Sequence, residues 1–136
     1  MAIIEEASPV APLSALRTAW PDLKWSWDGR LLTVVSSFGG EQVAQARAVT
    51  SRVLPQQFDS TSLASAPAPI LSIIERSGGL RGNQLAFCGG AAACMFFGLW
   101  WPWQGGGTVS LRVGLVSANE DPALTKQLRE LFGASS

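Results

Sequence analysis

Residues 82–111 read GNQLAFCGGAAACMFFGLWWPWQGGGTVSL, and none of them carries a charge. The nearest charged residues are Arg81 and Arg112, although 15% of the whole chain is charged. Charged side chains are absent where their removal from water costs too much free energy. We therefore expect this stretch to lie in a core, in a protein interface or in a membrane.

The same stretch divides into strands and turns. Residues 84–88 are predicted as a short strand and 94–101 as a longer one, with a break at Gly89-Gly90 and an end at Pro102. A turn is expected at 104–107. Residues 108–117 then alternate between large apolar and small or polar side chains, which predicts a half-buried strand. This division favours a sheet over a continuous apolar helix.

Residues 23–38, which read LKWSWDGRLLTVVSSF, predict a β-hairpin upstream of the uncharged stretch. Asp28-Gly29 between two alternating runs is typical of a two-residue type I′ turn. The predicted register sets Trp27 opposite Arg30, Trp25 opposite Leu32, and Leu23 opposite Val34. These side chains share one face of the hairpin, and we expect that face to point to the core.

Four helices are predicted around these strands, over 11–20, 41–54 and 69–77 and from Asp121-Pro122 onward, where Asp121 would be the N-cap. Residues 1–9 are expected to be a flexible N-terminus, and residues 55–67 an internal loop, of one domain that covers 1–136. The element order is α-β-β-α-α-β-β-β-α. It predicts an α+β fold with an antiparallel sheet of about five strands and helices packed on one face.

This order of elements resembles the profilin-like folds, which include the Roadblock, longin and PAS-like domains. The resemblance covers most of the chain and is one of element order. A Roadblock-like domain would be a dimeric, non-enzymatic platform that binds small GTPases or their regulators, and a PAS-like domain would bind a small ligand or cofactor. No functional residue is carried over from either family. The helix predicted at 69–77 is additional to the minimal Roadblock pattern.

Composition excludes several function classes. The chain has no histidine, so Ser-His-Asp and Cys-His catalysis and His-ligated metal sites are excluded. Cys88 and Cys94 are expected to be two buried free thiols, because no further Cys or His completes a metal site. Lys and Arg number 10, as do Asp and Glu, so nucleic acid is not an expected partner. We expect no catalytic residue, metal or cofactor.

A membrane location is the main alternative for part of the uncharged stretch. Residues 85–103 are apolar over a length that reaches a bilayer span, and Trp100, Trp101 and Trp103 at one end resemble an interfacial belt. The N-terminal residues carry two acids and no basic run, unlike a secretory signal peptide. We therefore expect a cytoplasmic protein, with association with the inner membrane as the alternative.

The preferred functional hypothesis is a non-enzymatic protein-interaction or regulatory domain that self-associates through residues 85–111. The partner-binding residues are predicted to be Phe96, Phe97, Leu99, Trp100, Trp101 and Trp103. A second hypothesis is a small-ligand domain or an unusual enzyme without histidine, in which Cys88, Cys94 and the tryptophans line a pocket. A third is a protein held in the bilayer by residues 85–103.

Overall fold

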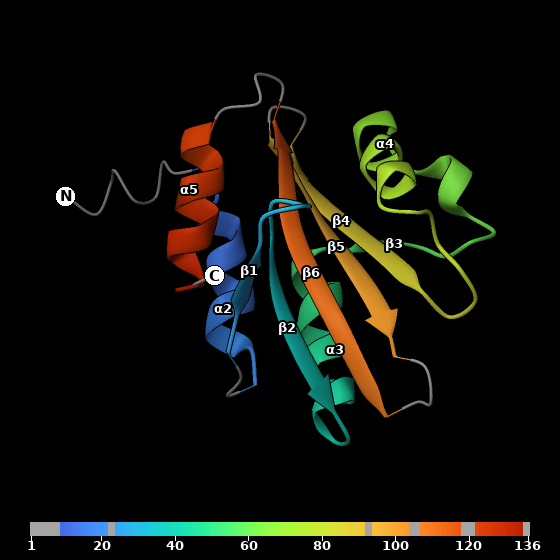
Figure 1. Ribbon diagram of the computed structural model, residues 1–136, viewed down its shortest axis with the longest axis horizontal. Helices are drawn as coiled ribbons and strands as arrows, with labels where there is room; N and C mark the ends of the chain where they lie inside the picture. The colour runs from blue at the N-terminus through green and yellow to red at the C-terminus, as the bar shows by residue number, and fades with distance from the viewer. Residues whose placement is uncertain (1–8, 22–23, 92–93, 104–106, 118–121, 135–136) are drawn as a thin grey trace.

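A computed structural model describes residues 9–21, 24–91, 94–103, 107–117 and 122–134. Its described helices are α2 (Ser14–Ala19), α3 (Gln42–Val53), α4 (Ala68–Arg76) and α5 (Pro122–Leu131), with short 3-10 turns at Ala11–Leu13 and Leu63–Ser65. Its described strands are β1 (Ser26–Asp28), β2 (Thr33–Gly39), β3 (Gln56–Phe58), β4 (Leu85–Ala91), β5 (Cys94–Pro102) and β6 (Thr108–Ser117). The fold is α+β, as predicted, and the strands form one sheet (Figure 1).

The sheet has six strands in the order β1-β2-β6-β5-β4-β3, and every neighbouring pair is antiparallel. The predicted count of five strands is therefore wrong by one, and the predicted order of elements lacks one strand. The additional strand, β3, lies inside the predicted loop 55–67 and pairs with Ala86–Cys88. Three residues are too short to show an alternating pattern, which explains why the sequence did not indicate this strand.

The uncharged stretch forms the middle of this sheet. Strands β4, β5 and the first part of β6 come from it, and β5 lies between the other two. The predicted break at Gly89-Gly90 is wrong, because both glycines belong to β4. Gly90 has a φ of 91°, and a Cβ there would lie 2.7 Å from the carbonyl oxygen of Cys94. Glycine thus allows the tight passage from β4 to β5.

Helices cover both faces of the sheet, so the prediction that all of them pack on one face is wrong. The first face contacts apolar side chains of the N-terminal segment, α3 and α5, among them Leu16, Val49 and Leu128. The second face packs against Ile70 and Ile74 of α4. In Figure 1, α4 stands apart from the other three helices, beside β4. Both faces need a cover because β5 is apolar at odd and even positions alike.

A connected series of aromatic rings fills the core on the first face. Neighbouring ring centroids lie 4.6–6.1 Å apart. In order, the rings belong to Phe132, Trp25, Trp20, Phe38, Trp100 and Phe87. The Trp20 indole also donates a hydrogen bond to Ser36 Oγ at 3.0 Å. These contacts join both ends of the described chain to the sheet through tilted and edge-to-face packing.

Trp25 and Val34 lie in the core as predicted, but the predicted register is wrong, and Leu32, predicted on the same face, is 54% exposed. Trp27 lies opposite Val34, and Asp28 lies opposite Thr33, so four residues form the turn in place of two. Asp28 Oδ1 accepts a hydrogen bond from the backbone N–H of Arg30 at 3.0 Å, and Leu32 closes the turn at a φ of 54°. The observed register differs from the predicted one by an even number of residues, so each strand side chain lies on the face predicted for it. The predicted position of Leu23 lies outside the described residues.

The described residues of the segment 85–103 form β4, β5 and Trp103, which follows β5. Among the described residues, no helix has both the length and the apolar character required to cross a membrane.

Gly114 of β6 provides a test of the packing on the second face. A Cβ at this position would lie 2.5 Å from Phe97 Cζ and 3.0 Å from Thr33 Cγ2. We predict that Gly114→Ala destabilises the protein by about 1–3 kcal/mol, because the buried Phe97 ring must leave its position. Urea unfolding measures the change. Gly29→Ala is the control, since its Cβ would meet only Trp27 Nε1 at 3.6 Å. Equal stability of the two variants would contradict this packing.

Candidate functional site

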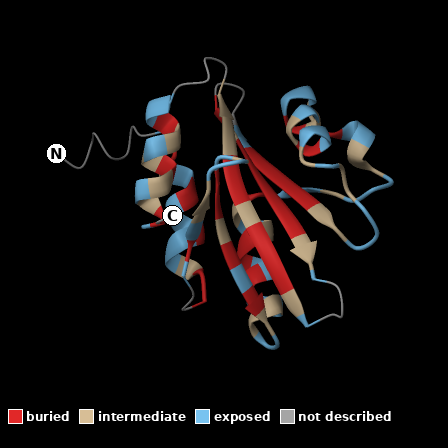
Figure 2. Ribbon diagram, in the orientation of Figure 1, coloured by how far each residue is buried: buried red, intermediate tan, exposed pale blue. Residues whose placement is uncertain are grey.

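Part of the second sheet face has no helix over it. The apolar cluster on this face joins α4 to β4 and β5, whereas β2 and β6 contribute few members to it. We call the uncovered part the open face. It consists of Val35, Ser37, Trp101, Trp103, Ser110 and Arg112, which the strand register places on the same side. In Figure 2 the exposed and intermediate colours interrupt the buried colour along β2 and β6.

Arg112 is the charged centre of the open face. Its guanidinium carbon lies 4.5 Å from the centroid of the Trp101 ring, and its Nε lies 3.4 Å from Asp28 Oδ2. The Arg112 and Asp28 side chains are only 19% and 14% exposed. A cation between an aromatic ring and a carboxylate is attracted by both, and partial removal from water strengthens these attractions. The pair thus holds Trp101 and the β1–β2 turn together.

The environment of Asp28 favours its charged form. Partial burial by itself raises the pKa of this carboxyl. Hydrogen bonds from the backbone N–H of Arg30, the Arg112 side chain and the backbone N–H of Leu31 lower the pKa by more. The net pKa therefore lies below the ordinary value of an aspartate, and Asp28 is ionised at neutral pH.

Trp103 is an exposed ring in a fixed position. Trp103 is 53% exposed. Its Nε1 donates a hydrogen bond to Ser110 Oγ at 2.6 Å, and its backbone N–H bonds the Thr108 carbonyl at 2.8 Å. Ser110 Oγ also lies 3.3 Å from Ser37 Oγ. The indole is thus oriented before any partner arrives, which lowers the entropy cost of a contact made by it.

The six predicted partner-binding residues do not form one surface. Phe96 and Trp100 belong to the core on the first face, and Phe97 and Leu99 are buried on the second face under α4. Trp101 is half-buried and Trp103 is exposed, so these two are the accessible members. Strand alternation separates the run into two faces. The prediction of partner binding itself stays a prediction.

Sequence reasoning missed the polar half of the open face. Asp28 and Arg112 are 84 positions apart in the chain, and only the pairing of β2 with β6 brings them together. One signal was present, since Ser110 and Arg112 interrupt the apolar pattern of 108–117 at every second position. That spacing indicates a face that is less apolar than the other.

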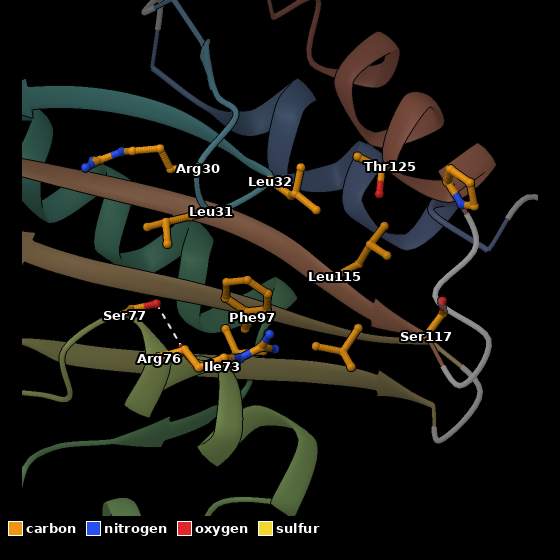
Figure 3. A pocket seen from close by; sticks show the side chains of 12 residues that line it. Arg30, Leu31, Leu32, Ile73, Arg76, Ser77, Phe97, Leu115, Ser117 and Thr125 are labelled. Atoms are coloured by element: carbon orange, nitrogen blue, oxygen red, sulfur yellow. Dashed lines mark hydrogen bonds between the residues drawn. The ribbon is translucent and has the colours of Figure 1, made fainter.

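A second feature is a hollow at the opposite end of β5 from Trp103, which residues from both sheet faces line. It encloses about 630 Å³ and is lined by Arg30, Leu31, Leu32, Ile73, Arg76, Ser77, Phe97, Leu115, Val116, Ser117, Pro122 and Thr125 (Figure 3). Most of its surface is apolar. No tryptophan or cysteine is among these residues, so the hollow differs from the pocket predicted between Cys88, Cys94 and the tryptophans.

The two cysteines lie on opposite faces of the sheet as free thiols. Cys88 packs beside Phe97 and Leu99, and its Sγ lies 3.1 Å from Gln56 Oε1. Cys94 belongs to the core on the first face. Burial raises the pKa of both thiols, which disfavours the reactive thiolate. The positions and the pKa shifts both describe structural cysteines.

The arrangement offers binding groups more than catalytic ones. Over the described part of the chain, no cluster of three His, Cys, Asp or Glu side chains comes together to hold a metal ion. In comparisons with known proteins, no protein-family model, no curated protein and no solved structure matches this chain. The open face and the hollow are thus the candidate sites.

The Asp28–Arg112 contact predicts a pH-dependent stability. Asp28→Asn removes the charge opposite Arg112, and we expect it to lower the free energy of unfolding at pH 7 by about 1–2 kcal/mol. Because the folded-state pKa of Asp28 is depressed, its stabilising effect is present above the unfolded-state pKa and is lost as pH falls through the folded-state pKa. Urea unfolding at several pH values should therefore show the two proteins converging below about pH 4.

The control for this experiment is Glu75→Gln, which removes an exposed carboxylate of α4. Its stability should follow that of the unmodified protein at every pH. A constant difference between Asp28→Asn and the unmodified protein throughout the acid range would contradict the favoured charged form of Asp28.

Proposed function

We propose that this protein is a non-enzymatic interaction domain that associates with a second copy of itself through the open face. The observation that carries the proposal is Trp103, an exposed indole held by a hydrogen bond beside the half-buried Trp101 and the stacked Arg112. Tryptophan and arginine are the residues that most often dominate binding energy at protein interfaces.

The composition of the open face suits an interface centre with a polar border. The exposed Trp103 ring supplies apolar area, whereas Ser37 and Arg112 supply groups that form hydrogen bonds. Interface centres are depleted in charge and enriched in aromatic residues and arginine, and their borders are polar. The apolar run 85–103, which ends at Trp103, agrees with this pattern.

Charge favours a second copy as the partner. The chain has 10 basic and 10 acidic residues, so two copies experience no net repulsion. Asp28 and Arg112 also lie side by side, which gives the region both signs of charge. A two-fold contact between identical faces can then set the negative group of one copy against the positive group of the other.

The sheet edges favour a contact through the face. The edge strands β1 and β3 are each three residues long. Short edge strands offer few free backbone groups to another sheet, so edge-to-edge pairing is disfavoured.

The chemistry of the open face supports binding over catalysis. Its two serine hydroxyls, Ser37 and Ser110, lie within hydrogen-bonding distance of each other, and Ser110 also accepts from Trp103. Activation of a serine nucleophile needs an adjacent base. The chain has no histidine to serve as one, and the carboxylate of Asp28 is paired with Arg112.

Trp103→Ala tests this proposal. We expect the unmodified protein to show a mass that rises toward that of a dimer over a concentration series in size-exclusion chromatography with light scattering. Truncation of a central tryptophan costs about 2 kcal/mol or more of binding energy, so the dimer dissociation constant should rise roughly thirtyfold. Thermal unfolding of the variant checks that the fold is retained.

Leu32→Ala is the matched control, because Leu32 is the other large apolar side chain that is strongly exposed among the described residues and lies outside the open face. Its self-association should equal that of the unmodified protein. A monomer at every concentration, or a dimer that Trp103→Ala leaves unchanged, would refute association through the open face.

A further inference from the structure

We infer that the hollow beside α4 is a binding site for a small amphipathic carboxylate, an aliphatic chain that ends in one carboxylate group. The inference does not rest on the proposed function. The hollow lies near Phe97 and Leu115, toward the start of β5 and the end of β6, whereas Trp103 follows the other end of β5. Each site can therefore be tested without the other.

Three separate elements line the hollow, and two of them, α4 and α5, pack on opposite faces of the sheet. The C-terminal half of α4 forms one side, the β1–β2 turn forms another, and the start of α5 contributes Pro122 and Thr125. Strand β5 supplies Phe97 from the second face, and β6 supplies Leu115 from the first face (Figure 3). A volume of about 630 Å³ is within the range of sites that take small molecules.

Aliphatic side chains make most of the lining. Leu31 and Leu32 come from the turn, Ile73 from α4, and Leu115 and Val116 from β6. Leu32 is 54% exposed and has a φ of 54°, a region that a leucine adopts at some cost in free energy. The position of Leu32 at the hollow therefore costs free energy in two ways. Its backbone is strained, and its apolar side chain stays in contact with water. An aliphatic ligand chain would remove that surface from water.

Among the described lining residues, the charged side chain that reaches into the hollow is that of Arg76, a residue that is also exposed to solvent. Figure 3 shows the Arg76 side chain reaching across the hollow toward Phe97, whereas the Arg30 side chain runs away from it along the surface. No described carboxylate forms an ion pair with Arg76, and Arg30 has only a 3.7 Å contact with Asp28. No acidic residue is among the described residues that line the hollow. The hollow thus favours an anion.

The balance of these groups selects the ligand class. A single inward guanidinium matches the two oxygens of one carboxylate, which it binds through paired N–H donors. Ser77 Oγ donates to the Ile73 carbonyl at 2.9 Å, so its hydroxyl hydrogen is already used within α4. The aliphatic walls suit a hydrocarbon chain better than a planar ring. A monocarboxylate with an aliphatic tail can pair with the Arg76 guanidinium and pack against the aliphatic lining.

Calorimetric titration of the full chain with decanoate, below the concentration at which it forms micelles, tests the inference. We expect saturable binding with one site per chain. Decyltrimethylammonium, which has the same tail and the opposite charge, and acetate, which lacks the tail, should bind at least roughly tenfold more weakly. Amide shifts in NMR spectra should locate decanoate at residues 30–32, 73–77 and 115–117.

Two variants test separately the contribution of the positive charge and that of the apolar surface to decanoate binding. Arg76→Gln should weaken decanoate binding roughly tenfold or more, because a hydrogen-bonded charge pair is lost. Arg81→Gln is the matched control, since Arg81 is an exposed arginine five positions along the chain and outside the lining. Leu32→Ser should weaken binding through loss of the apolar contact, with the charge kept.

Several results would overturn the inference. They are an absence of decanoate binding by the unmodified protein, equal binding of decyltrimethylammonium, equal loss of affinity in Arg76→Gln and Arg81→Gln, or amide shifts confined to other residues. Failure here leaves the dimer measurements with Trp103→Ala unaffected, so the two proposals stand or fall separately.

Discussion

The fold depends on the burial of β5 on both of its faces. Phe96 and Trp100 pack against the helical layer of the first face, while Phe97 and Leu99 pack under α4. A charged side chain at any of these positions would lose its hydration without a partner, at a large cost in free energy. The absence of charge in this stretch is therefore explained by a strand that is buried on both of its faces. Charge returns at Arg112, where the cover of the second face ends and where Asp28 and Trp101 stabilise it.

The incomplete cover of the second face sets the places where function is expected. Helix α4 packs against β4 and β5 and leaves the neighbouring surface of β2 and β6 open. The two most exposed large apolar side chains of the described residues, Leu32 and Trp103, lie toward opposite ends of this region. At one end an indole is held in place by Ser110, and at the other an arginine reaches over an aliphatic hollow. The two proposals follow from this division.

Sequence patterns predicted the elements better than their arrangement. The strand at 108–117 and the helix near 69–77 were predicted closely, because alternation and helical spacing are local signals. The amphipathic stripe of α4 showed that it packs, but a stripe carries no information on which sheet face it covers. The turn after Asp28 was predicted two residues too short, since its length depends on Asp28 accepting from Arg30. The candidate site was partly predicted through Trp101 and Trp103, whereas the pairing of Asp28 with Arg112 requires the strand order.

Native-state hydrogen exchange tests the double burial of β5 most directly. If β5 lies between two helical layers and two strands, its backbone amides from residue 96 to residue 100 exchange only through global unfolding, and their protection equals the full free energy of unfolding. The short edge strands β1 and β3 should exchange much faster through local opening. Exchange of the β5 amides as fast as that of the edge strands would show that β5 is not the centre of the core.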